Sequence, residues 1–382
     1  MAINYRKWDS LMDSSDEEDD SRAKLVQTRM PSKRHGAPAA PSARGPALSA
    51  KPAEAPAASA AAILGLPTLL TPPVPPRLGR AAVCTTVRGV CGRIESWVRW
   101  HLWVGFERLY IFFDDPSEVQ SVRLAKAAGG SAVVPLVRGS EVLRAAWARQ
   151  PSWQGMGANV DRDVQVRQLL NAQLAVELAR ASSLVWLLHI DSDELFLARP
   201  PSEPVGGPGS ASSSAEAGTA VMHFASLAAA GCECFVYHNY EAVPESAPLP
   251  THLAPCAVPP AGGPPTDPFV NLTLFKRCEA HVPARTHSQA AAALDMWRRR
   301  SQAGKYFLYY DNGKCACRVD TDAAWIPMSV HCCMPRKPNG EWDQARLQAN
   351  AWTNDPRQVG LRNTLEEASA VLHYPVRDMP AR

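Results

Sequence analysis

The chain has 382 residues, of which 46% are hydrophobic and 20% charged, and its formal net charge is +3. This mild positive excess suits an anionic small molecule and lacks the dense basic clusters of a nucleic-acid binder, so no nucleic-acid partner is expected. No apolar run reaches the roughly 20 residues needed to span a bilayer.

The first 80 residues differ in composition from the rest of the chain. Residues 1–20 hold seven acidic residues against two basic ones, and residues 31–80 are rich in Ala, Pro and Ser. Such segments bury too little apolar surface to offset the entropy of ordering. We therefore expect an acidic disordered tip over residues 1–30, an Ala/Pro-rich linker over 31–80 and one folded domain over 81–382.

From residue 81 the hydrophobic pattern alternates between strands and helices. We predict strands at 81–87, 108–113, 132–137 and 184–190, and helices at 93–105, 118–128 and 161–181. This alternation predicts the α/β class, with a mostly parallel sheet flanked by helices.

Two stretches rich in Pro interrupt the pattern, and we expect long loop insertions at 199–218 and 244–268. Further strands are predicted at 233–238, 269–276 and 306–310, and terminal helices at 342–352 and 364–374.

The most informative segment is the apolar strand that ends in Asp191, Asp193 and Glu194. Ligands of open α/β sheets bind at the carboxyl ends of the strands. Two carboxylates leaving an extended strand two residues apart point the same way and repel each other, and a divalent cation removes that penalty. We predict that Asp191 and Asp193 hold Mg²⁺ or Mn²⁺. The alternative is a pair of solvated turn acids.

Several further short blocks of sequence lie before and after this segment. They are Glu95–His101, Gly105–Asp115, Arg167–Asn171, His238–Glu245, Tyr310–Arg318, Val330–His331 and His373–Tyr374. Together they resemble the GT-A-fold glycosyltransferases of the family-2-like and family-92-like group over about residues 81–375. Two positions depart from that group: Arg88–Cys91 stands where it has an Asn-Glu pair, and Cys315 stands where it has a small Ser.

The resemblance implies a GT-A-like (Rossmann-like) fold and a transfer reaction. A sugar would move from a nucleoside-diphosphate donor to an unknown glycan, protein or lipid acceptor, with inversion and with metal dependence. Direct attack needs one general base near the acceptor hydroxyl, and Glu241 and Glu194 are the candidates.

Further residues are candidates for the donor site. Asp114 or Asp115 would meet the base or ribose, or else cap the following turn. Glu95 would face the nucleotide or buttress a loop. Gln168 and Asn171 lie one helical turn apart and would line the donor cleft or a solvated face.

Three residues near the end of the chain complete the predicted site. Lys314 and Arg318 would hold the diphosphate, because cations stabilise a departing phosphate, or would be ordinary surface cations. His331 would be a third metal ligand or a hydrogen-bonded core histidine.

The ten cysteines offer a rival interpretation as a zinc protein. The pairs Cys232-x-Cys234, Cys315-x-Cys317 and Cys332-Cys333 match structural zinc spacing poorly. The first twenty residues are charged and do not resemble a secretion signal, so the cysteines are interpreted as reduced thiols. A cytoplasmic location is expected, with the Golgi lumen as the alternative.

The tip carries a signal of its own. Ile3–Asp9 followed by Ser14–Asp20 resembles the N-terminal tip of the kinase-targeting co-chaperone of the heat-shock system. Ser14 and Ser15 precede an acidic run, the pattern that acid-directed kinases favour. Chaperone or kinase contacts and a non-catalytic sugar- or nucleotide-binding protein are therefore the alternatives to an enzyme.

Overall fold

The structure is a computed structural model, and it describes residues 78–90, 92–198, 220–243, 267, 269, 274–276, 313–322, 324–329, 331–354, 361–364 and 369–374. All of them belong to one compact unit, Ala58–Arg382. The expected tip and the insertion at 199–218 lie outside these residues, as does the strand expected at 306–310. The expected linker is described only from residue 78, and the second insertion only at residue 267.

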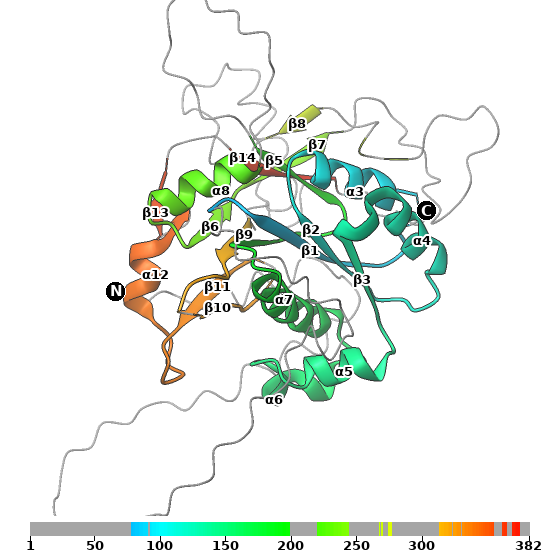
Figure 1. Ribbon diagram of the computed structural model, residues 1–382, viewed down its shortest axis with the longest axis horizontal. Coiled ribbons are helices and arrows are strands. Elements are labelled where there is room, and N and C mark those ends of the chain that lie inside the picture. The colour runs from blue at the N-terminus through cyan, green and yellow to red at the C-terminus, as the bar shows by residue number, and fades with distance from the viewer. Residues whose placement is uncertain are drawn as a thin grey trace, which may run out of the picture. The chain divides into compact units, whose positions relative to one another are not determined.

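An eight-stranded sheet forms the centre of the unit, in the order β13-β12-β6-β9-β4-β1-β2-β3 (Figure 1). These strands are β1 (Ala81–Val87), β2 (Arg108–Phe113), β3 (Val133–Val137), β4 (Trp186–His189), β6 (Cys234–Tyr237), β9 (Lys314–Arg318), β12 (Ala351–Thr353) and β13 (Arg362–Asn363). Neighbouring strands are parallel except at β9, which is antiparallel to both β4 and β6. The predicted α/β class with a mostly parallel sheet is confirmed.

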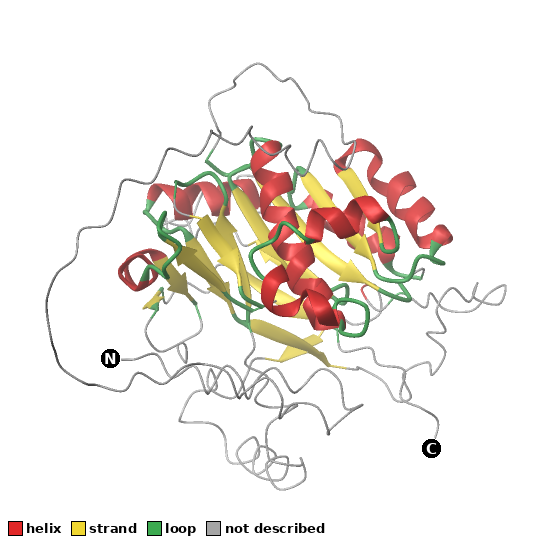
Figure 2. Cartoon of the chain, turned by 90° about the horizontal axis from the view of Figure 1, so that it is seen from below, coloured by secondary structure: helices red, strands yellow, loops and turns green. Residues whose placement is uncertain are grey.

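Helices flank this sheet (Figure 2). They are α3 (Ile94–Trp103), α4 (Val119–Gly129), α5 (Glu141–Trp147), α6 (Trp153–Met156), α7 (Val164–Ala181), α8 (Ala220–Ala229) and α12 (Gln344–Asn350), with short 3-10 turns at Gly130–Ala132 and Gly157–Asn159. The longest, α7, begins where the Asp163 carboxylate accepts the Gln165 amide at 2.8 Å. Such a side-chain cap satisfies an amide that has no partner within the helix.

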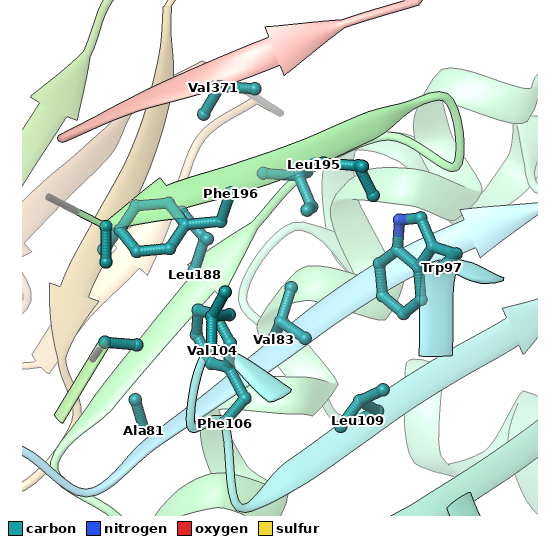
Figure 3. Packing of buried hydrophobic residues seen from close by; sticks show 14 of the residues in the cluster. Ala81, Val83, Trp97, Val104, Phe106, Leu109, Leu188, Leu195, Phe196 and Val371 are labelled. Carbon is teal, nitrogen blue, oxygen red and sulfur yellow. The ribbon is translucent and has the colours of Figure 1, made fainter. Parts of the chain in front are cut away.

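The fully buried strand β1 separates two layers. Ala81, Val83 and Val87 pack in one apolar cluster with Trp97 of α3 and with Phe224 of α8. Figure 3 shows part of this cluster, in which Val83 and Trp97 lie near Leu195. Burying so many large apolar side chains supplies most of the driving force for folding.

The other face of β1 meets α7. Thr86 accepts a hydrogen bond from Asn171 of that helix at 2.9 Å. Because side chains alternate along a strand, Thr86 and Val87 point to opposite faces. Both faces of β1 are therefore covered, in keeping with the burial of all seven of its residues.

A second, four-stranded sheet has the order β5-β14-β7-β8. Its strands are β5 (Glu194–Ala198), β7 (Asn239–Val243), β8 (Leu274–Lys276) and β14 (Ser369–His373). A separate hairpin pairs β10 (Ala324–Pro327) with β11 (Cys333–Arg336).

The helix predicted at 364–374 is wrong, because the end of that segment forms β14. This strand pairs antiparallel with β5 and parallel with β7. Val371 of β14 is fully buried. Pairing on both edges outweighs the local helical pattern, as tertiary context does for marginal segments.

The two sheets meet where β4 is followed by β5. Residues 191–194 form a tight turn, in which the Glu194 amide donates to the Asp191 carbonyl at 3.2 Å. The expectation that Asp191 and Asp193 leave an extended strand is therefore wrong, since β4 ends at His189. Trp97 and Trp100 of α3 hold β5 in place by donating to its carbonyl groups at 2.9 and 2.8 Å.

No helix in the described part of the chain has the length and apolar character required to cross a lipid bilayer.

Candidate functional site

The turn between β4 and β5 places acidic groups at two depths. The side chains of Asp191 and Asp193 are 30% and 29% exposed. The side chain of Glu194 is fully buried beneath them, as is that of Lys314. Because β4 is central in the sheet, the two outer carboxylates lie at the strand end where α/β proteins bind ligands.

Lys314 is the cation at the centre of this site. Its ammonium group pairs with the Asp191 carboxylate and lies 3.6 Å from Oε2 of Glu194. Burial opposes ionisation of Asp191, but Lys314, through its charge and its hydrogen bond, lowers the pKa of this carboxyl group to about 2. Asp191 is therefore a carboxylate at neutral pH.

Close packing of the backbone positions Lys314 at the start of β9. Lys314 is paired with Tyr237 of β6 in the sheet register. A Cβ at the preceding residue, Gly313, would lie 1.9 Å from the Tyr237 carbonyl oxygen. This close approach of β9 to β6 requires glycine at position 313. On its other edge, β9 pairs with β4.

Glu194 organises the turn from below. Its Oε2 accepts the Asp191 amide at 2.8 Å, and Asn239 donates to its Oε1 at 3.4 Å. Burial raises the pKa of Glu194 to about 7 despite the nearby Lys314. Glu194 therefore holds the loop in shape and is not exposed to an acceptor.

Two histidines border the same carboxylates. His331 donates from Nδ1 to the Gly313 carbonyl at 2.7 Å, which leaves a lone pair on Nε2. Burial, assisted by Lys314, lowers the pKa of His331 to about 3. Burial likewise lowers the pKa of His189, the last residue of β4, to about 4. Both rings are neutral at physiological pH.

His373 lies beside three acidic residues, and the sequence analysis assigned it no individual role. On neighbouring strands it stands in register with Glu194 and Glu241. Its Nδ1 is 2.9 Å from both Glu241 carboxylate oxygens, and its Nε2 is 3.7 Å from Oδ2 of Asp193. Burial is outweighed by these two carboxylates, which raise the pKa of His373 well above its usual range. Its only sequence signal was its place in the last matching block.

Two further polar side chains contact the turn, one from within a helix and one from the residue that precedes a helix. Gln168 of α7 donates to Oδ1 of Asp191 at 3.4 Å, so this predicted site residue joins the cluster. Arg93, which precedes α3 and was not predicted, donates to Ser192 at 3.4 Å.

Asp114 and Asn171 lie in a buried polar layer between β1, β2 and α7. Asp114 makes a two-pronged ion pair with Arg167, one contact of which is 2.8 Å. Asn171 accepts from Trp147 at 2.8 Å and donates to Thr86. The principal contacts of both residues are therefore internal to the fold.

The remaining predicted residues lie apart from the Asp191 turn. Asp115 accepts hydrogen bonds from Ser117, which lower its pKa, in the turn before α4. Glu95 pairs with Arg99 one turn along the exposed face of α3.

Arg318 ends β9 and is paired there with Trp186, the first residue of β4. It therefore lies at the opposite end of the strand from Lys314, roughly 13 Å away at the rise of a strand. Its guanidinium group pairs with Asp320 at 2.8 Å. The structure brings Lys314 to the acidic turn but does not bring Arg318 there.

Among the described residues, no group of three or more His, Cys, Asp or Glu is placed to hold a metal ion. The donors are nevertheless of the kind that Mg²⁺ and Mn²⁺ accept, namely two carboxylates and a neutral imidazole. A cationic side chain stands against each carboxylate: Lys314 at Asp191 and His373 at Asp193. The chemistry of these donors therefore fits a divalent cation. In this structure the cation paired with Asp191 is the Lys314 ammonium group.

The cysteines do not form the zinc site considered from the sequence. The described cysteines are free thiols, and those at Cys315 and Cys333 are 3.3 Å apart. The described cysteines form no group of three or more metal-binding side chains, either with one another or with His, Asp or Glu.

The structure is thus that of an α/β protein with a cluster of charged side chains at the carboxyl end of its central strand. No model of a protein family matches the chain. It is similar to Glycosyltransferase-like At2g41451 of Arabidopsis thaliana, with 22% identity over 302 residues, which is 76% of this chain and 53% of that protein. It is also similar to Glycosyltransferase-like At3g57200 of Arabidopsis thaliana, with 22% identity over 76% of this chain and 46% of that protein.

The chain thus spans about half the length of the curated relatives it matches. Both relatives are named glycosyltransferase-like, and neither supports the co-chaperone resemblance of the tip, which lies outside the described residues. Among solved structures, core-mannan synthase A from Aspergillus fumigatus in its Mn/GDP form has 11% identity over 44% of each chain. Its TM-score of 0.25 is too low to support an argument about this protein.

Proposed function

We propose that this protein is a glycosyltransferase that moves a sugar from a nucleoside-diphosphate donor to a glycan, protein or lipid acceptor. One observation carries the proposal: two partly exposed carboxylates follow the central strand, and one of them is paired with a buried ammonium group. The ammonium group suits an anionic ligand, and the carboxylates suit a divalent cation bound to that ligand. The similarity to glycosyltransferase-like proteins agrees with it.

Lys314 is the proposed partner of the donor diphosphate. When the bond to the sugar breaks, negative charge accumulates on the departing diphosphate, and a positioned cation stabilises that charge. In a buried site this effect is stronger than in water. A divalent ion held by Asp191, Asp193 and His331 would supply the same neutralisation, which is the metal dependence we propose.

Glu241 is the better candidate for the general base. Glu194 is fully buried, and its Oε2 already accepts the Asp191 amide. The Glu241 carboxylate is held from one side by His373, which fixes its orientation. A base that accepts the proton of the acceptor hydroxyl must be held in this way, within hydrogen-bond reach of the acceptor.

The proposal is tested with the full chain and a panel of UDP- and GDP-sugars, by measuring sugar release with Mn²⁺ and with a chelator. We expect turnover of one donor, and a loss of at least about 100-fold for Asp193→Asn, the range for removing one preorganised charge contact. The matched control is Asp161→Asn, since Asp161 pairs with Arg144 on the surface with its side chain 63% exposed. This control should keep wild-type turnover.

Turnover that persists unchanged in Asp193→Asn would contradict the assignment of the site. Binding of a nucleotide sugar without any turnover would instead support the non-catalytic binding protein. The feature that favours this second candidate is the segment Arg88–Cys91, which replaces the Asn-Glu pair of the glycosyltransferases that the sequence resembles.

A further inference from the structure

The ammonium group of Lys314 lies between an exposed and a buried carboxylate. The side chain of Lys314 is fully buried and its partner Asp191 is 30% exposed, while Glu194 below them is fully buried. A buried charge is tolerated only when it is paired, and both acids are partners of Lys314 in the free protein. One carboxylate oxygen of Asp191 is thus already engaged by a cation.

A divalent cation at Asp191 would compete with this ammonium group. Both need the same carboxylate, and two cations a few ångströms apart in a partly buried site repel each other strongly. Lys314 cannot withdraw far, because the register with Tyr237 and the close approach at Gly313 fix its backbone. An ammonium group that turns away from Asp191 loses this ion pair, and a new anion would replace it.

A diphosphate at the same strand end supplies that anion. Its oxygens offer the ammonium a new partner, and Asp191 then becomes available to a metal ion. The neighbouring carboxylates of Asp193 and Glu241 are balanced by His373 and Arg93, so neither cation is left over to replace Lys314 at Asp191. With Lys314 re-paired, the acidic turn has an excess of negative charge and attracts a divalent cation.

We propose that Lys314 excludes a divalent cation from Asp191 in the free protein and admits it only when a nucleoside diphosphate takes the ammonium group. This inference rests on the proposed donor class. By linkage, the nucleotide must then tighten metal binding, and the metal must tighten nucleotide binding by the same factor.

The test is equilibrium dialysis of Mn²⁺ against the full chain, with UDP or GDP either absent or present at equal concentration in both chambers. Without nucleotide, we expect Lys314→Met to bind Mn²⁺ about tenfold more tightly than the wild type, a coupling of ordinary size. With the matching nucleotide, the wild type should gain about tenfold in Mn²⁺ affinity and Lys314→Met should gain little.

Two variants control the charge change. Lys337→Met makes the same substitution at a lysine that is 44% exposed and paired with Glu341 at 3.8 Å, and it should follow the wild type. Lys314→Arg keeps a cation at the site and should also bind Mn²⁺ weakly without nucleotide. Circular dichroism and the melting temperature establish that each variant is folded.

Equal Mn²⁺ affinity of wild type and Lys314→Met without nucleotide would overturn the inference, as would a wild type that gains no affinity with either nucleotide. The second comparison needs no variant, so it decides the matter even if Lys314→Met fails to fold. Neither measurement depends on catalysis. Coupled Mn²⁺ binding without donor turnover would therefore keep this inference and reject the transferase, whereas turnover without coupling would do the reverse.

Discussion

At the scale of single residues, the site is governed by which charged groups are paired. His373 illustrates this, because it contacts Glu241 through one ring nitrogen and faces Asp193 through the other. An acid this deeply placed is stable as a carboxylate only when a cation or several hydrogen-bond donors accompany it. His373 therefore stabilises the acidic cluster and orients the proposed base.

Substitution of His373 separates these contributions. His373→Leu removes both contacts and should lower the free energy of unfolding by about 3 kcal/mol, since it leaves a buried charge without its partner. His373→Asn places an amide donor near the Nδ1 position and should recover part of this loss. Urea unfolding of the wild type and the two variants measures these differences, and a His373→Leu protein as stable as the wild type would show that the contacts of His373 contribute nothing.

At the scale of elements, the position of β9 decides whether Lys314 reaches the acidic turn. This strand runs antiparallel between β4 and β6 in an otherwise parallel sheet. Its first residue is held by the approach of Gly313 to the Tyr237 carbonyl. The strand thus links the backbone packing of the sheet to the charge balance of the site.

Gly313→Ala tests this link. The added methyl group would lie 1.9 Å from a backbone oxygen that has no room to retreat, so β9 must shift away from β6. We expect a destabilisation of about 2 kcal/mol, in the range for overpacked sites, together with weaker nucleotide binding. Gly155→Ala is the matched control, because no atom lies within 4 Å of its added Cβ. A Gly313→Ala protein as stable as this control would disprove the steric argument.

At the scale of the whole unit, buried polar contacts join the layers that the apolar core packs together. Arg167 of α7 pairs with Asp114 at the end of β2, and Arg138 beyond β3 lies 4.0 Å from the same acid. Both side chains of the Arg167–Asp114 pair are at most 5% exposed. The pair fixes the position of α7 relative to the sheet, and the same helix carries Gln168 to the site.

A double-mutant cycle measures this contribution. Arg167→Met should destabilise the protein by about 3–5 kcal/mol, because Asp114 is left buried and without its main partner. The double variant Arg167→Met, Asp114→Asn removes the unpaired charge and should be more stable than Arg167→Met alone. Additive losses in thermal or urea unfolding would mean that the two residues do not act as a pair.

The sequence by itself determined the features that depend on contiguous residues. The apolar run before Asp191 predicted the central strand, and the alternation of patterns predicted the α/β class that the structure confirms. The acidic turn was also found in this way, because it follows directly on that strand. Its roles in binding and catalysis stay predictions.

Only the tertiary structure decided which distant residues meet at that turn. Lys314 and Arg318 belong to one short strand, yet only Lys314 reaches Asp191, 123 residues away in the chain. The segment that ends in His373 had a helical pattern and became a strand because β5 and β7 offered it two free edges. Hydrogen-bonded pairing of strands and pairing of buried charges depend on partners that are remote in sequence. Local patterns therefore do not contain them.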